Sequence, residues 1–246
     1  MPTRAELAEY TGAYVLPRPQ YEAIVTEDYT YVAGPHNAWV LDVRSPNLDW
    51  ARAESKRRGI ELVEWWIGWS SPSGLAEHLL AHGLVPDDEP VLVGMTTATE
   101  PRVAPHIDVR RIDTAADYLE AIAIDWEVWQ LSENERATRF AKEVQRFDDD
   151  HAAGVAHHWA AFHEGRPVGF GRAVDMEGGV ALMGGAVLAE ARGRGVYRAL
   201  VRARWEHAVA RGTPLLVVQA GHMSAPVLDG LGFVRHGEIH LYADRL

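Results

Sequence analysis

A glycine-rich turn in the second half of the chain has the residue types that bind an anion. Residues 187–200 read VLAEARGRGVYRAL, so an apolar strand leads into a turn and then into a helical pattern. A helix start leaves backbone N–H groups unpaired and carries the positive end of the helix dipole. Glycines let this backbone approach a phosphate closely, and Arg192 and Arg194 add positive charge at the same place. The turn therefore predicts a phosphate-binding cradle.

Two common phosphate-binding motifs do not fit this turn. A P-loop requires a Lys followed by Ser or Thr after its second glycine, and neither follows here. A dinucleotide-binding fingerprint requires a third glycine where Arg198 stands, and an acidic ribose ligand about 20 residues further on. The chain lacks this fingerprint as well. The kind of phosphate-binding turn must therefore be inferred from the helices and strands around it.

The elements around the turn alternate between helices and strands. Two amphipathic helices are expected first, the second with a capping box at Ser132–Glu135. Three strands joined by short turns follow, and the long helix after the glycine-rich turn is expected to end at Gly212. A strand, a short helix and a last strand complete this half. The expected helices are 113–131, 132–147, 195–211 and 224–231, and the expected strands are 155–163, 168–174, 180–188, 215–219 and 239–243.

The first half predicts a shorter version of the same order. Both halves place a helix that ends in Arg-Gly before an apolar strand, at Arg58-Gly59 and at Arg211-Gly212. We therefore expect a duplicated domain, with a linker in the Pro-containing segment 96–107. The expected first-half strands are 38–43, 60–69 and 90–95, the helices are 48–58 and 74–82, and the two domains are residues 1–100 and 108–246.

Composition excludes several classes of protein. The 246 residues carry 24 Lys and Arg against 35 Asp and Glu, a net charge of −11, and no Cys. Without Cys there is no disulfide framework, zinc–thiolate site or thiol nucleophile. The acidic balance argues against a nucleic-acid partner, which needs a basic face. No apolar run is long enough for a membrane helix and no targeting segment is visible, so we expect no membrane partner and a cytoplasmic location.

The turn and the order of elements together resemble the GCN5-related N-acetyltransferase (GNAT) family across residues 108–246. The acetyl-CoA loop of that family reads Arg/Gln-x-x-Gly-x-Gly/Ala after a strand, and Arg192–Tyr197 fits it except at Tyr197, which replaces the last small residue. The family also has a short helix that ends in Gly-Phe, here Gly232-Phe233. The resemblance implies an α+β (mixed α/β) fold, with a mostly antiparallel central sheet flanked by helices, in two GNAT-like halves.

The resemblance also implies where acetyl-CoA binds. The pantetheine arm is expected to pair with the backbone of the third strand like an added strand. A bulge at Gly184-Gly185 would open a slot between this strand and strand 215–219. The pyrophosphate is expected on the N–H groups of residues 193–198, and a backbone N–H near Val187 polarises the thioester carbonyl. The predicted cofactor-binding residues are Gly185, Ala186, Val187, Leu188, Arg192, Gly193, Arg194, Gly195, Val196, Tyr197, Arg198 and Ser224. No metal is expected.

The acid–base residues are less well defined by the resemblance. The family often has a Tyr that protonates the leaving thiolate, and this chain has Leu228 at that position. Tyr242 and His222 are substitutes that could approach the slot, and we take them as the candidate catalytic residues. The candidates for accepting the proton of the amine are His222, Glu177, Asp175 and Glu127.

The remaining polar and aromatic features have structural interpretations. His157 and His158 alternate on a strand and therefore face opposite sides. Asp148–Asp150 is expected to be a solvated loop, and Trp65, Trp66 and Trp69 are expected in the core or an interface. The first half has Pro46 where the acetyl-CoA loop would lie, which removes a donor N–H, so we expect that half to be degenerate and without acetyl-CoA.

The expected function is an acetyl-CoA-dependent N-acetyltransferase that transfers the acetyl group directly to an amine. The acceptor is expected to be a small molecule, with a protein N-terminus or lysine left open. Because the chain has no Cys, no acyl-cysteine intermediate can form. The alternative function is a non-catalytic acyl-CoA-binding sensor or scaffold. The oligomer is expected to be a monomer or a homodimer.

Overall fold

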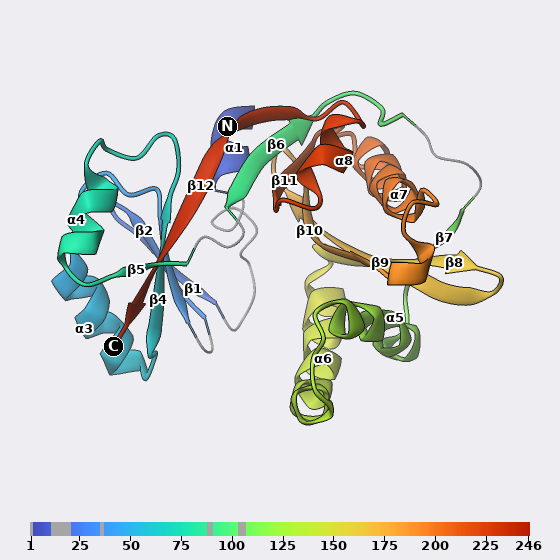
Figure 1. Ribbon diagram of the computed structural model, residues 1–246, viewed down its shortest axis with the longest axis horizontal. Helices are drawn as coiled ribbons and strands as arrows, with labels where there is room; N and C mark the ends of the chain where they lie inside the picture. Colours follow the sequence, from blue (N-terminus) through green and yellow to red (C-terminus); the bar gives the residue numbers. More distant parts are fainter. Residues whose placement is uncertain (1, 11–20, 35–36, 88–90, 103–106) are drawn as a thin grey trace. The chain divides into compact units, whose positions relative to one another are not determined.

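The computed structural model describes residues 2–10, 21–34, 37–87, 91–102 and 107–246. Contacts between residues divide the chain into two compact units, coloured by sequence in Figure 1. Unit 1 falls within residues 97–218 and 227–233, and unit 2 falls within residues 2–96, 219–226 and 234–246. Within the described ranges, no helix combines the length and the apolar character that crossing a membrane requires.

Unit 1 is built on five neighbouring strands in the order β11-β10-β9-β8-β7. Adjacent strands are antiparallel, except that β10 and β11 are parallel. The strands are β7 (Asp108–Ile112), β8 (Ala156–His163), β9 (Arg166–Met176), β10 (Gly179–Val187) and β11 (Leu216–Ala220). The predicted α+β fold with a mostly antiparallel sheet is confirmed.

Helices cover both faces of these strands. The α5 and α6 helices pack on one face and α7 packs on the other (Figure 1). Neighbouring residues of β8 distinguish the faces, because His157 contacts His207 of α7 whereas His158 contacts Tyr118 of α5. The two histidines therefore point to opposite sides, as predicted. The helices are α5 (Ala115–Val128), α6 (Glu133–Ala153), α7 (Val196–Ala210) and α8 (Ala225–Asp229), with a 3-10 turn η1 (Ala189–Ala191) before α7.

Local sequence signals set the ends of these helices. Thr114 caps the start of α5, and Ser132 forms the predicted capping box with Glu135 at the start of α6. Gly212 follows α7 with a φ of 75°, in the left-handed conformation that glycine favours after a helix. These signals explain why the helix starts in this half were predicted closely.

The segment Asp148–Asp150 was predicted wrongly as a solvated loop. It is helical, because α6 continues to its left-handed C-cap at Gly154. Asp150 is buried and accepts a hydrogen bond from Arg172 of β9 at 3.0 Å. The composition of the segment was misleading, because acidic residues are common in loops. The arginine that pairs with Asp150 lies on a later strand, so a local sequence pattern does not show the pair.

The third strand of unit 1 is bulged and separates from its parallel neighbour. The register of β10 against β9 shifts between Leu182 and Gly185, where the sequence predicts a bulge. The described ladder between β10 and β11 has only two pairs, Val180 with Leu216 and Ala181 with Val217. Beyond Ala181, the backbone groups on this edge of β10 are no longer paired with β11. The two strands therefore stop pairing where the sequence predicts that they separate.

Unit 2 is built on neighbouring strands in the order β1-β2-β3-β4-β12-β6, with β5 also paired to β12. Its largest core cluster joins α3 and α4 to the sheet and contains Tyr31, Val63, Trp65 and Leu79, all fully buried. The expectation that Trp65 lies in the core is confirmed. The elements are α1 (Arg4–Glu9), β1 (Glu22–Val25), β2 (Thr30–Ala33), β3 (Ala38–Leu41), α3 (Leu48–Arg58), β4 (Leu62–Ile67), α4 (Leu75–Ala81), β5 (Val85–Pro86), β6 (Leu92–Thr97) and β12 (Val234–Arg245).

The last strand of the chain belongs to unit 2. β12 pairs antiparallel with β4 over His240–Arg245 and with β6 over Val234–Ile239. The expected domain of residues 108–246 includes this strand, whereas the structure places it among strands of the first half. Ile239 and Tyr242 are buried in this pairing. A sequence pattern shows that a strand exists but not which sheet receives it.

The order of elements is repeated in the two halves. Three antiparallel strands, a helix, a strand and a helix appear as β1-β2-β3-α3-β4-α4 and again as β8-β9-β10-α7-β11-α8. In each case the strand before the first helix is parallel to the strand after it, β3 with β4 and β10 with β11. The expected repetition of element order is therefore seen, although β1, β2, β5, β7 and α1 were not predicted.

Replacing Tyr242 by Ala tests the place of β12. The ring is 9% exposed in the core cluster of unit 2, so its removal is expected to lower the free energy of unfolding by about 3 kcal/mol. Urea denaturation measures this change. The control is Val234→Ala on the same strand, where the side chain is 60% exposed and the change is expected to stay within about 0.5 kcal/mol. Equal small effects would contradict the burial of Tyr242.

Candidate functional site

The predicted anion-binding turn joins β10 to α7. Gly193 and Gly195 have φ values of 74° and 88°, in the left-handed region that glycine adopts without strain. Gly195 is the N-cap of α7 and offers no side-chain hydrogen bond to the helix start. The N–H of Ala199 donates to the Gly195 carbonyl at 3.0 Å, whereas within the described residues the N–H groups of residues 193–196 have no acceptor. These N–H groups are open to an anion.

The arginines of the turn surround this helix start. Arg192 donates from Nε to the Val187 carbonyl at 3.2 Å, and Arg194 donates from Nη1 to Nε2 of His163 at 2.9 Å. Both side chains are exposed, as is Arg198 in the first turn of α7. In the described part of the chain none of the three forms an ion pair with a carboxylate, so their charge is not neutralised by the protein. The turn is a local concentration of positive charge in an acidic chain.

The backbone of β10 next to the turn has little side-chain cover. Gly184 and Gly185 are exposed, and the strand stays paired with β9 through Val187 opposite Gly169. A Cβ added to Gly185 would lie 3.0 Å from Cε2 of Tyr197, so the Tyr197 ring packs directly over this glycine. Tyr197, which departs from the family's loop pattern, thus packs against the bulge. This strand edge lies between the bulge and the predicted anion-binding turn.

Two of the predicted acid–base residues lie in unit 2. Tyr242 is buried in the core of that unit, opposite Trp65 of β4 and Pro86 of β5. This placement differs from the prediction that Tyr242 reaches the slot, because β12 pairs with strands of the first half. His222 is exposed in the turn after β11. Ser224, predicted to contact the cofactor, lies in the same turn and donates from Oγ to the Gly221 carbonyl at 3.2 Å.

The other predicted positions lie in unit 1. Leu228, at the place of the family's Tyr, is fully buried in α8 and supplies only apolar packing. Glu127 is exposed on α5, and Glu177 is exposed in the turn between β9 and β10. Like His222, these two candidate bases are exposed to water.

Asp175 is held in a network of donors. Its carboxylate lies 3.0 Å from Nε2 of His157, 2.8 Å from Nε2 of His207 and 2.9 Å from Nε of Arg211. Burial alone would raise the pKa of Asp175, but the hydrogen bonds from the two histidines outweigh burial and hold this pKa well below its usual value. A carboxylate with so low a pKa and so many donors is a poor general base.

The same cluster has the spacing of a metal site but not its protonation. The ligand atoms of His157, Asp175 and His207 lie within 4.8 Å of one another. However, Arg111 donates to Nδ1 of His157 at 2.8 Å, so the neutral ring carries its proton on Nε2 and donates it to Asp175. A metal ion would need a free lone pair on Nε2, the nitrogen that carries this proton. Arg111 and Arg211 also already place positive charge beside the cluster. We interpret the cluster as a clamp that joins α7 to β8 and β9.

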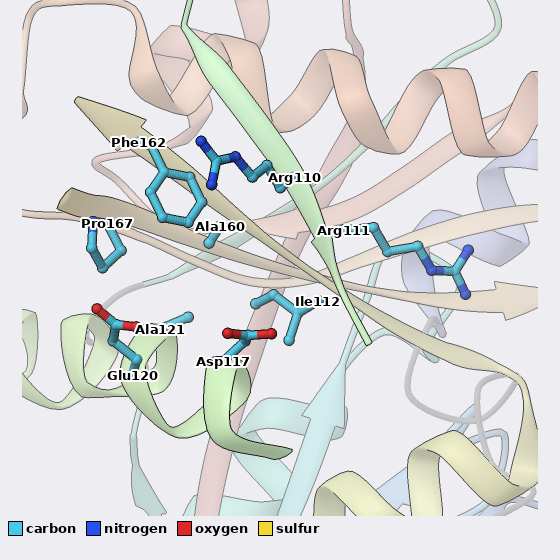
Figure 2. Close-up of a pocket in the computed structure, with 9 residues that line it drawn as sticks. All are labelled: Arg110, Arg111, Ile112, Asp117, Glu120, Ala121, Ala160, Phe162 and Pro167. Carbon is cyan, nitrogen blue, oxygen red and sulfur yellow. The ribbon is translucent and has the colours of Figure 1, made fainter. Parts of the chain in front are cut away.

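A small cavity of about 120 Å³ lies on the α5 side of the sheet. Figure 2 shows that its lining side chains come from β7, α5, β8 and the start of β9. Arg110 lies 4.3 Å above the ring of Phe162, and Asp117 and Glu120 of α5 supply opposite charge nearby. Arg111 points away from the others (Figure 2). None of the predicted site residues lines this cavity.

One residue near the slot was missed by the sequence analysis. Arg204 lies on the buried face of α7, with its guanidinium against β9 and β10. In a helical pattern an arginine predicts an exposed position, so nothing in the local sequence marks it. Gly171, which makes room for it, belongs to another element, β9.

Comparisons with known proteins agree with this geometry. Residues 119–233 match the model of the Acetyltransferase (GNAT) family, a segment that includes the turn and α7. No curated protein matches the chain. Among solved structures, the chain is similar to a GCN5-related N-acetyltransferase from Kribbella flavida, with 14% identity, a TM-score of 0.70, and coverage of 99% of this chain and 96% of that one.

Two further structures match most of this chain. One is a tandem GNAT protein from the clavulanic acid biosynthesis pathway, with 16% identity, a TM-score of 0.63, and coverage of 97% of this chain and 87% of that one. The other is a GCN5-related N-acetyltransferase from Sphaerobacter thermophilus, with 14% identity, a TM-score of 0.62, and coverage of 90% and 82%. At these identities the likeness establishes the fold.

The fold is that of the acyl-CoA N-acyltransferases. Residues 119–233 form a domain that matches the acetyltransferase (GNAT) family. The cosubstrate of this family is acetyl-CoA. The fold of the whole chain, including its first half, is shared with a tandem GNAT protein.

Replacing Asp175 by Asn tests the clamp on α7. The variant is expected to lose about 2 kcal/mol of unfolding free energy at pH 7, because charge-assisted bonds from two histidines and an arginine are weakened. Since the folded pKa of Asp175 lies below the unfolded value, the contribution is present above about pH 4 and is lost as the pH falls further. Urea denaturation of both proteins between pH 7 and pH 3 measures it.

The difference between the two proteins should therefore shrink as the solution becomes acidic. A difference that is the same at every pH would contradict an ionised Asp175 as the source of the stability. Glu177→Gln, a nearby exposed carboxylate, serves as the control and is expected to change stability by less than about 0.5 kcal/mol at any pH.

Proposed function

We propose that this protein is an N-acetyltransferase that transfers the acetyl group of acetyl-CoA directly to an amine, most readily that of a small molecule. The observation that carries the proposal is the unpaired helix start at residues 193–196, placed directly after a strand whose edge is open. A ligand with an anionic head group followed by an extended arm needs these two features in this order. Acetyl-CoA, with its pyrophosphate and pantetheine arm, has both.

The residues present fit this cosubstrate. The N–H groups of residues 193–196 would hold the pyrophosphate, with positive charge from Arg192, Arg194 and Arg198 around them. The edge of β10 beyond Ala181 would hold the pantetheine arm by backbone hydrogen bonds, in the manner of an added strand. The arm then points back from the turn toward the bulge at Gly184-Gly185, which puts the thioester there.

The equivalent helix start in unit 2 lacks these features. Asn47 is the N-cap of α3, and its side chain accepts a hydrogen bond from the N–H of Trp50 at 3.1 Å. That donor is therefore used within the chain, and Pro46 has no N–H to offer. These contacts support the proposal that the first half is a degenerate copy that does not bind acetyl-CoA.

When bound, acetyl-CoA supplies an activated acyl group. The chain's contribution is to bind, orient and stabilise: the turn and strand edge place the thioester, and positioning accounts for much of the rate of such a transfer. The amine nitrogen forms a bond to the acyl carbon, the C–S bond breaks, the electron pair goes to sulfur, and the amine loses a proton. A thiol with a pKa near 8.5 is a tolerable leaving group without a dedicated acid.

The residue that accepts the amine proton must be a candidate whose side chain is not already engaged by donors. Asp175 is engaged by three donors, whereas Glu127, Glu177 and His222 are exposed. We propose that one of these exposed groups accepts the proton, through water where it does not reach the amine. The net charge of −11 suits a cationic amine as the acceptor.

The alternative function is an acyl-CoA sensor or scaffold without turnover. It is favoured by one observation, the buried Leu228 at the position of the family's acid. The two functions differ in whether free thiol is released when an amine is supplied.

Replacing Gly195 by Asp tests the phosphate cradle. The new side chain would bring negative charge to the helix start and strain a φ of 88°, so acetyl-CoA affinity measured by calorimetry is expected to fall at least about tenfold. The matched control is Gly74→Asp at the N-cap of α4, where φ and ψ are 83° and 0°. That variant carries the same strain and charge, and its affinity should equal the wild type's. Undiminished binding by Gly195→Asp would exclude this cradle.

Release of CoA thiol tests catalysis. Wild-type protein is incubated with acetyl-CoA and a panel of small primary amines, and free thiol is measured against time. We expect release with at least one amine and only background release without it, with loss of the activity in Gly195→Asp. Tight acetyl-CoA binding with no amine-dependent thiol release across cationic and neutral amines and lysine-containing peptides would support the sensor instead.

A further inference from the structure

Arg204 of α7 is an arginine buried without a carboxylate partner. Its side chain is 1% exposed, and within the described residues its hydrogen bonds go only to backbone carbonyls. Nε donates to Leu200 at 2.9 Å, and Nη1 donates to Arg172 of β9 and Gly184 of β10, both at 3.2 Å. Nη2 is buried and has no hydrogen-bond partner in the structure.

One glycine, Gly171, makes space for this guanidinium, and a second, Gly185, lies beside it. Gly171 of β9 and Gly185 of β10 are opposite each other in the ladder. A Cβ at Gly171 would lie 3.3 Å from Cζ of Arg204, and a Cβ at Gly185 would lie 3.9 Å from Nη2. The guanidinium therefore lies against the backbone at the bulge, and a side chain at Gly171 would crowd it. Glycine inside a strand weakens the strand, so this arrangement has a cost in β9.

The unpaired charge has a further cost. Burial lowers the pKa of the Arg204 guanidinium, because the charged form has lost its water. A buried donor without an acceptor typically costs about 1–3 kcal/mol, and more when it is charged. An apolar side chain of similar length would fill the same space at no such cost. The charge lies under the bulge of β10, and this position indicates a role at that bulge.

The bulge lies at the thioester end of the proposed cosubstrate. The pyrophosphate at residues 193–196 fixes one end of the arm, and the strand edge leads back from there to Gly184-Gly185. Arg204 holds the Gly184 carbonyl, and because the peptide bond is planar and trans, the N–H of Gly185 must point the opposite way. The guanidinium thus fixes the orientation of the peptide beside the reacting group.

We propose that Arg204 is a positioning residue for acyl transfer, which fixes the Gly184–Gly185 peptide and whose unneutralised charge stabilises the thiolate of CoA as it leaves. This inference rests on the proposed function. The bond from the amine nitrogen to the acyl carbon forms while the C–S bond breaks, and the electron pair passes to sulfur. Arg204 transfers no proton in this step. Its charge offsets the negative charge that develops on sulfur, in a chain that has Leu228 in place of a proton donor.

The test measures the thiol pKa of CoA bound to the protein. The ultraviolet absorbance of the thiolate is followed against pH for CoA in wild type, Arg204→Met, Arg204→Gln and Arg204→Lys. A unit charge within about 10 Å at an effective dielectric of about 20 shifts a pKa by about one pH unit. We therefore expect the bound thiol in wild type to titrate about one unit below free CoA, the Met and Gln variants to lose this shift, and Lys to retain most of it.

Two controls separate charge from structure. Arg202→Met removes an arginine on the same helix that pairs with Glu206 at 2.8 Å on the exposed side, and its bound thiol should titrate as in wild type. Acetyl-CoA affinity in the neutral Arg204 variants should stay within about threefold of wild type, because the thioester has no charge on sulfur. Circular dichroism and urea denaturation show whether each variant is folded. If Arg204→Met does not fold, Arg204→Gln serves as the neutral variant.

The outcomes distinguish this inference from the function on which it rests. If wild-type protein binds neither CoA nor acetyl-CoA, the proposed function fails. If it binds CoA but the bound thiol titrates as free CoA does, or titrates alike in wild type and in the neutral variants, the role of Arg204 is overturned. A residue that only supported the fold would change stability without moving the thiol titration, and would show no difference between Lys and Met.

Discussion

The site depends on the point where β10 and β11 stop pairing. Up to Ala181 the two parallel strands share a ladder, and beyond it the backbone of β10 has an open edge toward that neighbour. The bulge between Leu182 and Gly185 starts this separation, and the Gly-rich turn at the end of the strand leads directly into the unpaired start of α7. The backbone groups of an unpaired strand edge and an unpaired helix start need hydrogen-bond partners, from water or from a ligand. A single extended, anionic ligand can satisfy both.

Much of this arrangement could be predicted from local sequence. The turn at Arg192–Gly195, the capping box at Ser132 and the bulge at Gly184-Gly185 are short signals whose physical cause lies within a few residues. What could not be predicted depends on distant partners. Tyr242 was expected near the slot, but long-range pairing places its strand beside β4. Arg204 looks like a surface residue, and only the fold brings Gly171 and Gly185 beneath it.

The order of elements that the two halves share is compatible with two kinds of helix start. Both place a helix after a strand and before a parallel strand. At α7 the N-cap is a glycine without a side-chain cap, so the helix start stays open, whereas at α3 the Asn47 side chain satisfies a helix N–H itself. A good N-cap stabilises a helix by about 1 kcal/mol. In the first half, the chain caps its own helix start at α3 and gains this stability. In the second half, the equivalent N–H groups at the start of α7 stay open to a ligand.

The position of β12 has a consequence for how the protein folds. Its strand fills the gap between β4 and β6, yet most of the chain separates it from these partners. Contacts between residues so far apart close a long loop and slow folding. On the ribosome, the sheet of the first half cannot be completed until β12 has been made, although domains generally fold in order from the N-terminus. Until then β4 and β6 carry an open edge, the kind of surface at which chains pair with the wrong partner.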